Sequence, residues 1–225
     1  MSVTRNIRLR RRPRRNTTAR VTGNRGLSHL LEIYQGLSGF GVNIEGLNEY
    51  KTTYGEVTDD GIKELSDKFT QYFPVSKLSA KQRTFYDLGC GIGRLNLGMA
   101  ILHPEIQSIG VEIVPDRVKQ ANNALERLNV LNITKRINII ERSIFDPTIN
   151  INNASWIFIS NLCFDDNIMS KLYNKLDSEC KKGCVIICSR ALPLLDVSRL
   201  EQIEENVIIP MTWDAKSSCI IYMVK

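Results

Sequence analysis

The sequence of 225 residues carries a formal net charge of +6 at pH 7, and 43% of its residues are hydrophobic. This length suits one domain with its own core and a small appendage. Apolar runs stay short of the roughly 20 residues that cross a bilayer, and no apolar segment follows the N-terminal arginines, so we exclude a membrane protein and expect a soluble, intracellular one.

The first 25 residues hold nine arginines and no acidic residue, which leaves 21 basic and 24 acidic side chains, a net charge of −3, on the other 200 residues. A segment whose charges are all positive and that has few apolar side chains to bury is predicted to be a disordered tail. Because arginines neutralise phosphates, we expect salt-sensitive binding to a polyanion such as DNA. A nuclear-import signal and a plain solubilising tail are the alternatives. The densest part contains Arg8, Arg10, Arg11, Arg12, Arg14 and Arg15.

Residues 26–53 form a glycine-rich approach segment with a short helix predicted near 27–34, and residues 54–225 form the main domain. There the pattern alternates between helix and strand. The predicted helices cover about 58–72, 93–102, 115–128 and 166–181, and the strands cover the run ending at 87, then 107–111, 137–141, 155–160 and 185–188. This alternation predicts an α/β fold with a mostly parallel sheet and a ligand crevice at the carboxyl ends of its strands.

Two β-rich stretches, 206–209 and 219–224, end the sequence and predict an antiparallel pair that closes the sheet. A mixed sheet of this kind resembles the Rossmann-like class I S-adenosylmethionine-dependent methyltransferases. The six cysteines form no C-x-x-C pair and lie mostly in apolar runs, so we expect buried free thiols in a reducing compartment, with no disulfide and no metal site.

The strand ending at Asp87 runs into a glycine-rich turn and then a helix. Glycines allow the backbone of such a turn to approach a nucleotide-type cofactor closely. Asp87 precedes the glycines and Glu112 ends the next strand, an order that favours S-adenosylmethionine over NAD, with a purely structural turn as the alternative. The candidate cofactor residues in this unit are Asp87, Gly89, Cys90, Gly91, Gly93 and Arg94.

Two later strand ends carry further candidates. Phe145 could stack on an adenine ring or belong to the core. Asn161 directly follows the predicted strand 155–160. Free lysine has a pKa near 10.4, so the reacting amine must first be deprotonated, and the neutral amide oxygen of Asn161 could then hold it in line with a methyl donor. A turn-forming asparagine is the alternative. The Asn-Pro-Pro-Tyr motif of nucleic-acid adenine methyltransferases is absent.

Taken together, the motifs resemble those of the disruptor-of-telomeric-silencing histone lysine methyltransferases, the non-SET, class I enzymes that methylate a lysine of histone H3 in nucleosomes. The resemblance covers about residues 50–225. Its discriminating parts are Tyr54 to Glu56, the segment around Asn161, and Trp213. The other matching parts are the glycine turn, residues 110–112, 141–145 and 182–190.

The resemblance implies S-adenosylmethionine as cofactor, with Glu112 on the ribose hydroxyls, Ile144 and Phe145 at the adenine, and Asn161 beside the lysine channel. A loop over the methionine end would consist of Tyr54, Gly55, Glu56 and Val57. The implied partner is the nucleosome, histone H3 and DNA, gripped by the arginine tail of a nuclear, monomeric enzyme.

The sequence also departs from the family. Ile144 replaces an acidic residue, so Asp146 is an alternative partner for the adenine amino group. The family's channel tyrosine, seven residues after Trp213, is Ile220, and we expect Tyr222, on the same face of a strand, to replace it as a catalytic residue. The predicted function is lysine methylation of histone H3 in nucleosomes. A nucleic-acid methyltransferase, or a catalytically weak chromatin-binding protein, are the alternatives.

Overall fold

The computed structural model describes residues 23–47, 52–77, 83–128 and 131–225. The six arginines from Arg8 to Arg15, on which the predicted DNA contact rests, lie outside these residues.

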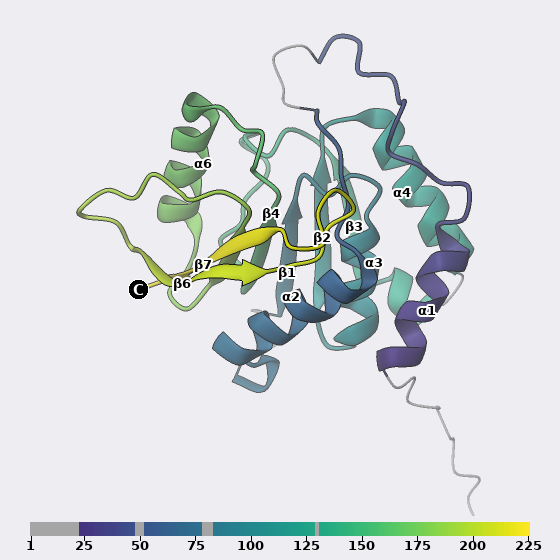
Figure 1. The fold of residues 1–225 in the computed structure, drawn as a ribbon, viewed down its shortest axis with the longest axis horizontal. Coiled ribbons are helices and arrows are strands. Elements are labelled where there is room, and N and C mark those ends of the chain that lie inside the picture. Colours follow the sequence, from purple (N-terminus) through teal and green to yellow (C-terminus); the bar gives the residue numbers. More distant parts are fainter. Residues whose placement is uncertain (1–22, 48–51, 78–82, 129–130) are drawn as a thin grey trace, which may run out of the picture.

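One seven-stranded sheet organises the described chain, with the strand order β3-β2-β1-β4-β5-β7-β6 (Figure 1). The parallel strands are β1 (Thr84–Leu88), β2 (Gln107–Glu112), β3 (Ile137–Glu141), β4 (Trp156–Ile159) and β5 (Val185–Cys188). The last two, β6 (Leu200–Ile208) and β7 (Ser218–Val224), are antiparallel and join the sheet through β7 against β5. This confirms the predicted mixed sheet and its closing pair.

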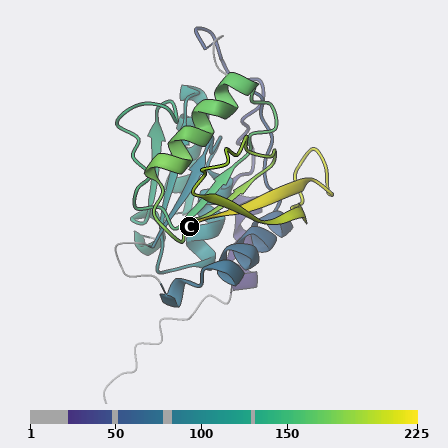
Figure 2. The ribbon, with the colours of Figure 1, turned by 90° about the vertical axis from the view of Figure 1, so that its left-hand side faces the viewer.

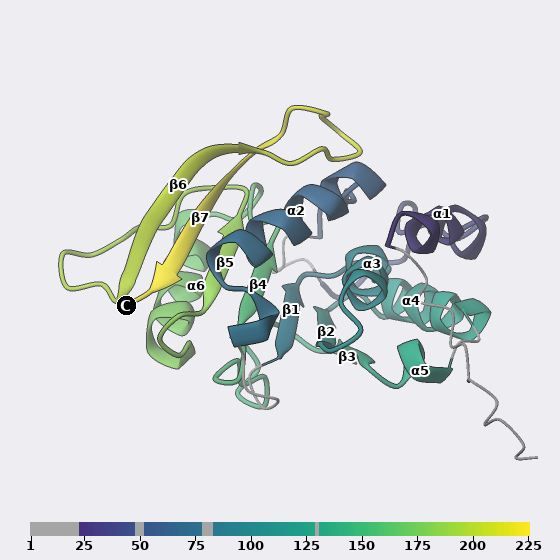
Figure 3. The ribbon, with the colours of Figure 1, turned by 90° about the horizontal axis from the view of Figure 1, so that it is seen from below.

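Helices cover both faces of the sheet. They are α1 (Gly23–Ile33), α2 (Asp59–Tyr72), α3 (Arg94–Leu102), α4 (Pro115–Leu128), α5 (Leu131–Thr134) and α6 (Asp166–Glu179), with a short 3-10 helix η1 (Val75–Lys77). Seen from below, α1, α2 and α3 lie on one side of the strands and α6 on the other (Figure 3), and Figure 2 shows α6 across the near face. No helix of the described chain is long and apolar enough to span a membrane.

The alternation of side chains along the strands builds two cores. On β1, Phe85 faces the core shared with α1, α2 and α3, whereas Tyr86 and Leu88 face the core shared with α6. Strands buried on both faces read as continuous apolar runs, which is why the central strands could be located from the sequence.

The predicted helices and strands match the structure closely, with three differences. Helix α1 begins at Gly23, ahead of the predicted 27, so residues 23–25 of the predicted disordered tail are helical. Strand β6 begins at Leu200, ahead of the predicted 206, because its stretch rich in glutamate hides the pattern and its register shifts twice near Asn206, whose φ is 57°. The short helices η1 and α5 were absent from the prediction, since three or four residues are too few for a helical period.

The segment before the main domain is held on α4 by arginines. Arg127 donates to the carbonyls of Ile33 and Gln35 at the end of α1. The Tyr34 hydroxyl donates to the carbonyl of Ile92 in the glycine turn. The segment is therefore packed against the helix that follows β2, and this places the residues after it at the carboxyl ends of the strands.

Candidate functional site

A cavity of about 310 Å³ lies at the carboxyl ends of the parallel strands, where strand topology predicts a ligand crevice. Its volume is at the lower end of the range for small-molecule sites. Six of the predicted cofactor residues line it: Tyr54, Gly55, Gly89, Glu112, Ile144 and Phe145. The rest of the wall is mostly apolar. It comes from the ends of β1 and β2, the first turn of α4, the segments after β3 and β4, α6, and the bend between β6 and β7.

The glycine turn has the backbone conformation that the sequence predicted, but several of its N–H groups are bonded within the protein. Gly89, Gly91 and Gly93 all have positive φ, from 55° to 96°, which explains the choice of glycine. Several N–H groups of the turn are nevertheless used by the protein, because Gly89 and Cys90 both donate to the carbonyl of Val111. The turn thus offers close approach through its missing side chains, and these donors are not free for a ligand.

Glu112 ends β2 inside the cavity and is only 5% exposed. One carboxylate oxygen accepts from the N–H of Gly91 at 2.8 Å, and the other accepts from Ile113 and Val114 at 2.9 Å each. A carboxylate has about four acceptor positions, so three bonds fix its orientation and leave capacity for a ligand hydroxyl. Glu112 therefore ties the glycine turn to the start of α4 and presents a charged acceptor to the cavity.

A smaller cavity of about 30 Å³ adjoins the first and shares Tyr54, Gly55 and Trp213 with it. This is room for one small polar group or a water. Five more predicted cofactor residues line it: Glu56, Val57, Asp87, Cys90 and Arg94.

Asp87 is the most perturbed carboxylate at this site. It is 4% exposed, and among the described residues none donates a hydrogen bond to its side chain. Burial, and then the negative charge of Glu112, raise the pKa of Asp87 to about 8. A cation in the small cavity would find an unpaired acidic group there, whereas Arg94 is already paired with Asp59 at 2.8 Å.

The opposite end of the main cavity is formed by the segment after β3. Phe145 and Ile144 line it together with Arg142, and both apolar side chains also pack on the core shared with α6. The expected alternative acceptor, Asp146, does not line the cavity, and one of its oxygens accepts from both the backbone and the hydroxyl of Thr148. Ile144 and Phe145 therefore line the cavity, and their contact with the adenine ring stays a prediction.

Tyr54 forms one wall of both cavities and is packed from several sides. Its ring lies edge-on to Phe40 with centroids 4.8 Å apart, and its hydroxyl donates to Glu56. A Cβ on Gly91 would lie 2.5 Å from the ring, which a real contact never does. Burial and the Glu56 carboxylate raise the pKa of Tyr54 well above its usual value, so the phenol stays a donor. Tyr54 therefore lies directly over the glycine turn.

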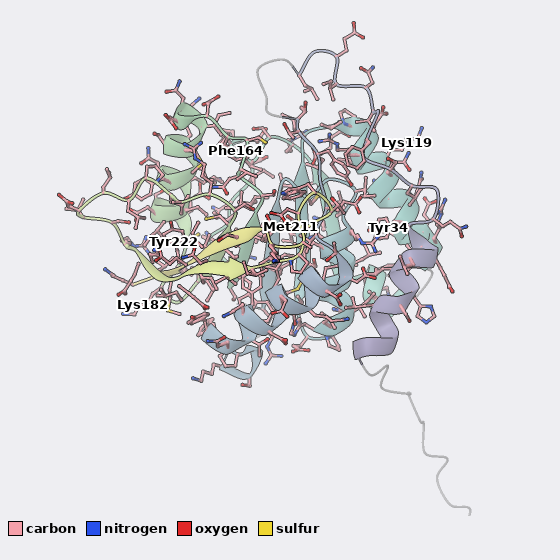
Figure 4. All side chains as sticks on the ribbon, viewed as in Figure 1. Tyr34, Lys119, Phe164, Lys182, Met211 and Tyr222 are labelled. Carbon is pink, nitrogen blue, oxygen red and sulfur yellow. The ribbon has the colours of Figure 1, made fainter. Side chains whose placement is uncertain are left out.

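The segment after Tyr54 is bonded to the bend between β6 and β7. Val57 forms an antiparallel bridge with Met211, and the Thr212 N–H donates to the carbonyl of Glu56 at 2.8 Å. Figure 4 labels Met211 in this bend. The Trp213 ring packs on Gly55, where an added Cβ would lie 2.2 Å from it. Two segments that are far apart in the sequence thus form one wall of the site.

Replacing Gly55 with alanine is expected to displace the Trp213 ring and weaken cofactor binding. Overpacking costs about 1–3 kcal/mol, and about 1.4 kcal/mol corresponds to a tenfold loss of affinity. Calorimetric titration with S-adenosylhomocysteine measures this loss of affinity. In a Trp213→Ala background the same substitution should cost little, since no ring is left to displace; an equal cost in both backgrounds would contradict the contact.

Asn161 does not line either cavity. Its side chain is fully buried, its amide nitrogen donates to the carbonyl of Arg190, and its amide oxygen accepts from the Arg190 N–H, both at 2.9 Å. The amide therefore joins the ends of β4 and β5, and the expected position in the channel is not confirmed. The preceding residue, Ser160, lines both cavities instead.

Tyr222 also lines neither cavity, so its expected channel position is not confirmed. It pairs with Ile186 on β5, two residues further from the strand ends than Ile220, and is fully buried in the core shared with α6. Its hydroxyl accepts from the Leu192 N–H at 3.0 Å. In Figure 4 Tyr222 lies on β7, apart from Phe164, which lines the cavity.

Sequence reasoning missed several residues of the wall. Ser160 directly follows a buried strand, and its position at a strand end was the available signal. Arg117, in the first turn of α4, is 5% exposed and lines the main cavity. Nothing in the local pattern distinguishes it from Arg127, the other arginine of the helix, because its partners are distant in the sequence.

Two comparisons concern the sequence. Residues 41–212 match the model of a family described as histone methylation protein DOT1. A protein-lysine N-methyltransferase of Saccharolobus islandicus (strain REY15A) is 30% identical over 102 residues, which are 45% of this chain and 58% of that protein. The chain therefore spans less than two thirds of this relative.

Solved structures share the fold at low sequence identity. The glycopeptide N-methyltransferase MtfA in complex with S-adenosyl-L-homocysteine superposes with a TM-score of 0.54 at 12% identity, over 76% of this chain and 92% of that one. A mutant of MtNAS in complex with S-adenosylmethionine gives 0.50 at 14% identity, over 89% and 74%. Together with the strand order, these likenesses show the class I methyltransferase fold.

Proposed function

The chain belongs to the DOT1 histone methylation protein family, with S-adenosylmethionine as its cofactor, and we propose that it methylates a lysine side chain of histone H3 in nucleosomes. One observation carries the proposal. A single cavity contains both the ribose-binding candidate Glu112 and an open apolar end formed by Leu162, Phe164 and Trp213. Leu162 and Trp213 are 50% and 42% exposed, so this end meets the surface.

The apolar end suits the aliphatic stem of a lysine, which packs on apolar surface while its amine continues inward. It also excludes water from the site of transfer. Ser160 is a polar group of the wall near this end, and its hydroxyl could accept a hydrogen bond from a neutral amine.

S-adenosylmethionine supplies a methyl group on a positively charged sulfur. When bound, it would pass this methyl group to the lone pair of a neutral lysine amine and would leave as S-adenosylhomocysteine. The protein's part is to hold the two ends in line and keep them dry. Glu112 would hold the ribose, and Asp87 would face the amino-acid end. The lysine must first lose its proton, since its ordinary pKa is near 10.4.

The test is methyl transfer from labelled cofactor to intact nucleosomes, free histones, and naked DNA or RNA, followed by mass spectrometric mapping. We expect labelling on an H3 lysine, much stronger in nucleosomes than in free histone. Equal or stronger labelling of a naked nucleic acid would refute the proposal in favour of a nucleic-acid methyltransferase. Failure to bind the cofactor at all would indicate a non-catalytic chromatin protein.

Removal of residues 1–22 is expected to weaken nucleosome binding while leaving cofactor affinity unchanged, because the deletion stops before α1. If the six arginines from Arg8 to Arg15 each neutralise one phosphate, the slope of log affinity against log salt falls by roughly 5. Binding measured from low to physiological salt checks this. A full-length control with these arginines changed to glutamine should behave like the deletion; unchanged salt dependence would contradict a DNA-binding tail.

A further inference from the structure

Arg117 makes a set of contacts that no part of the proposed reaction requires. Its Nε donates to the carbonyl of Gly39 at 3.1 Å, and its Nη2 donates to the carbonyl of Thr52 at 2.7 Å. One guanidinium therefore binds two backbone positions that are well separated in the approach segment, and Thr52 lies two residues before Tyr54.

The same guanidinium also contacts Tyr54 directly. Its central carbon lies 4.6 Å from the centre of the Tyr54 ring, within the range of a cation–π interaction. On other sides the ring meets Gly39 and Gly91, where an added Cβ would lie 2.2 Å and 2.5 Å from ring atoms. Besides Phe40 and Glu56, the position of Tyr54 is thus set by Arg117 together with two residues that have no side chain.

Burying a guanidinium is costly unless its donors are satisfied. Burial lowers the pKa of Arg117, while Glu112 and Tyr54 act in the opposite direction. An apolar residue would pack there at less cost but could not bind both carbonyls, since only arginine offers several donors in a rigid planar fork. Simple packing therefore does not account for this residue.

Arg127, on the same helix, provides an internal comparison. It also donates to two carbonyls of the approach segment, those of Ile33 and Gln35, but it is exposed and does not contact Tyr54. The two arginines do the same structural work on α4. They differ in that Arg117 lines the cofactor cavity.

We propose that Arg117 is a positioning residue that holds Tyr54 against the glycine turn and thereby sets the affinity for the cofactor. It acts through Tyr54 and takes no part in methyl transfer. The proposal rests on the cofactor and not on the identity of the methyl acceptor, so it can hold even if the acceptor is not a histone.

The experiment compares Arg117→Gln with Arg127→Gln by calorimetric titration of S-adenosylmethionine and S-adenosylhomocysteine. Arg117→Gln should bind both at least about tenfold more weakly, a change of about 1.4 kcal/mol. Arg127→Gln should bind both as the unmodified protein does. Melting temperatures without cofactor show whether the two variants are equally folded. Similar cofactor affinities for the two variants would overturn the proposal.

A double-mutant cycle with Tyr54→Leu tests the route of the effect. If Arg117 acts through Tyr54, Arg117→Gln should cost little further affinity in the Tyr54→Leu background. A full additional loss there would overturn the proposal, because Arg117 would then act on the cofactor or the fold directly. Arg117→Lys should bind with intermediate affinity, since one ammonium cannot reproduce the fork; affinity equal to that of the unmodified protein would likewise refute it.

Discussion

Glu112→Gln is expected to weaken binding of S-adenosylmethionine by on the order of a hundredfold. The substitution removes the charge that would strengthen bonds to the ribose hydroxyls, and hydrogen bonds to charged groups contribute about 1.5–3 kcal/mol each. It also turns an amide NH₂ towards backbone donors, because the carboxylate now accepts from Gly91, Ile113 and Val114. A lower melting temperature should accompany the weaker binding.

The neighbouring strand offers a matched control. Glu141 pairs with Glu112 in the register of β2 and β3, but its side chain is exposed and does not line the cavity. Glu141→Gln should therefore bind the cofactor normally. Titration of both variants, at a temperature where circular dichroism shows each to be folded, separates loss of binding from loss of fold. Equal binding by the two variants would refute a ribose role for Glu112.

Binding of S-adenosylmethionine is expected to release a proton from Asp87. The pKa of Asp87 is raised from 3.8 to about 8, so the free protein at pH 7 carries this side chain mostly protonated. The ammonium group at the amino-acid end of the cofactor favours the carboxylate form. Affinity should therefore rise by up to about tenfold per pH unit below pH 8 and level off above it.

Calorimetry at pH 7 in buffers of different ionisation enthalpy measures the released proton, which should be close to one per cofactor. Asp87→Asn cannot titrate, so it should release none and bind as weakly as the unmodified protein does at low pH. Asp146→Asn is the matched control, because the pKa of Asp146 is lowered and stays outside this range. Proton release by Asp87→Asn equal to that of the unmodified protein would exclude Asp87 as the source.

The same shift affects the stability of the free protein, with a definite sign. A carboxyl group whose pKa is higher in the folded state stabilises that state fully below its unfolded pKa of 3.8, and this contribution is lost as the pH rises towards about 8. Without cofactor, the part of the stability that depends on Asp87 should decrease over this range, and Asp87→Asn should abolish that decrease.

The sequence was sufficient for the fold because its central strands are buried on both faces and its helices are regular. The run that became β4 is apolar throughout, the run that became β1 is apolar apart from Thr84 and Asp87, and Pro115 marks the start of α4, as expected for a proline in a first helical turn. Glu112 could be located because a charged residue directly follows the apolar run of residues 109–111. Such signals are local, and local signals survive in a single sequence.

The expected positions that the structure does not confirm, and the residue that was missed, concern side chains whose direction depends on distant partners. An asparagine at a strand end was placed correctly, but Asn161 turns away from the cavity because the backbone of Arg190 satisfies its amide. Strand alternation gave the correct face for Tyr222 but not its depth below the edge of the sheet, which is set by the register of β7 on β5. Arg117 depends on partners more than sixty residues earlier in the sequence.

The late position of β7 in the chain has a consequence for biosynthesis. Within the described sheet, β6 pairs only with β7, and β7 lies between β6 and β5. A nascent chain that has emerged only as far as β6 therefore lacks the central partner of that strand, and Val57 has no bridge to Met211. Contacts between such distant residues form slowly. The part of the cavity wall that contains Trp213 should thus form late in synthesis. Ribosome-bound chains are therefore expected to retain S-adenosylmethionine only after residues 218–224 have emerged.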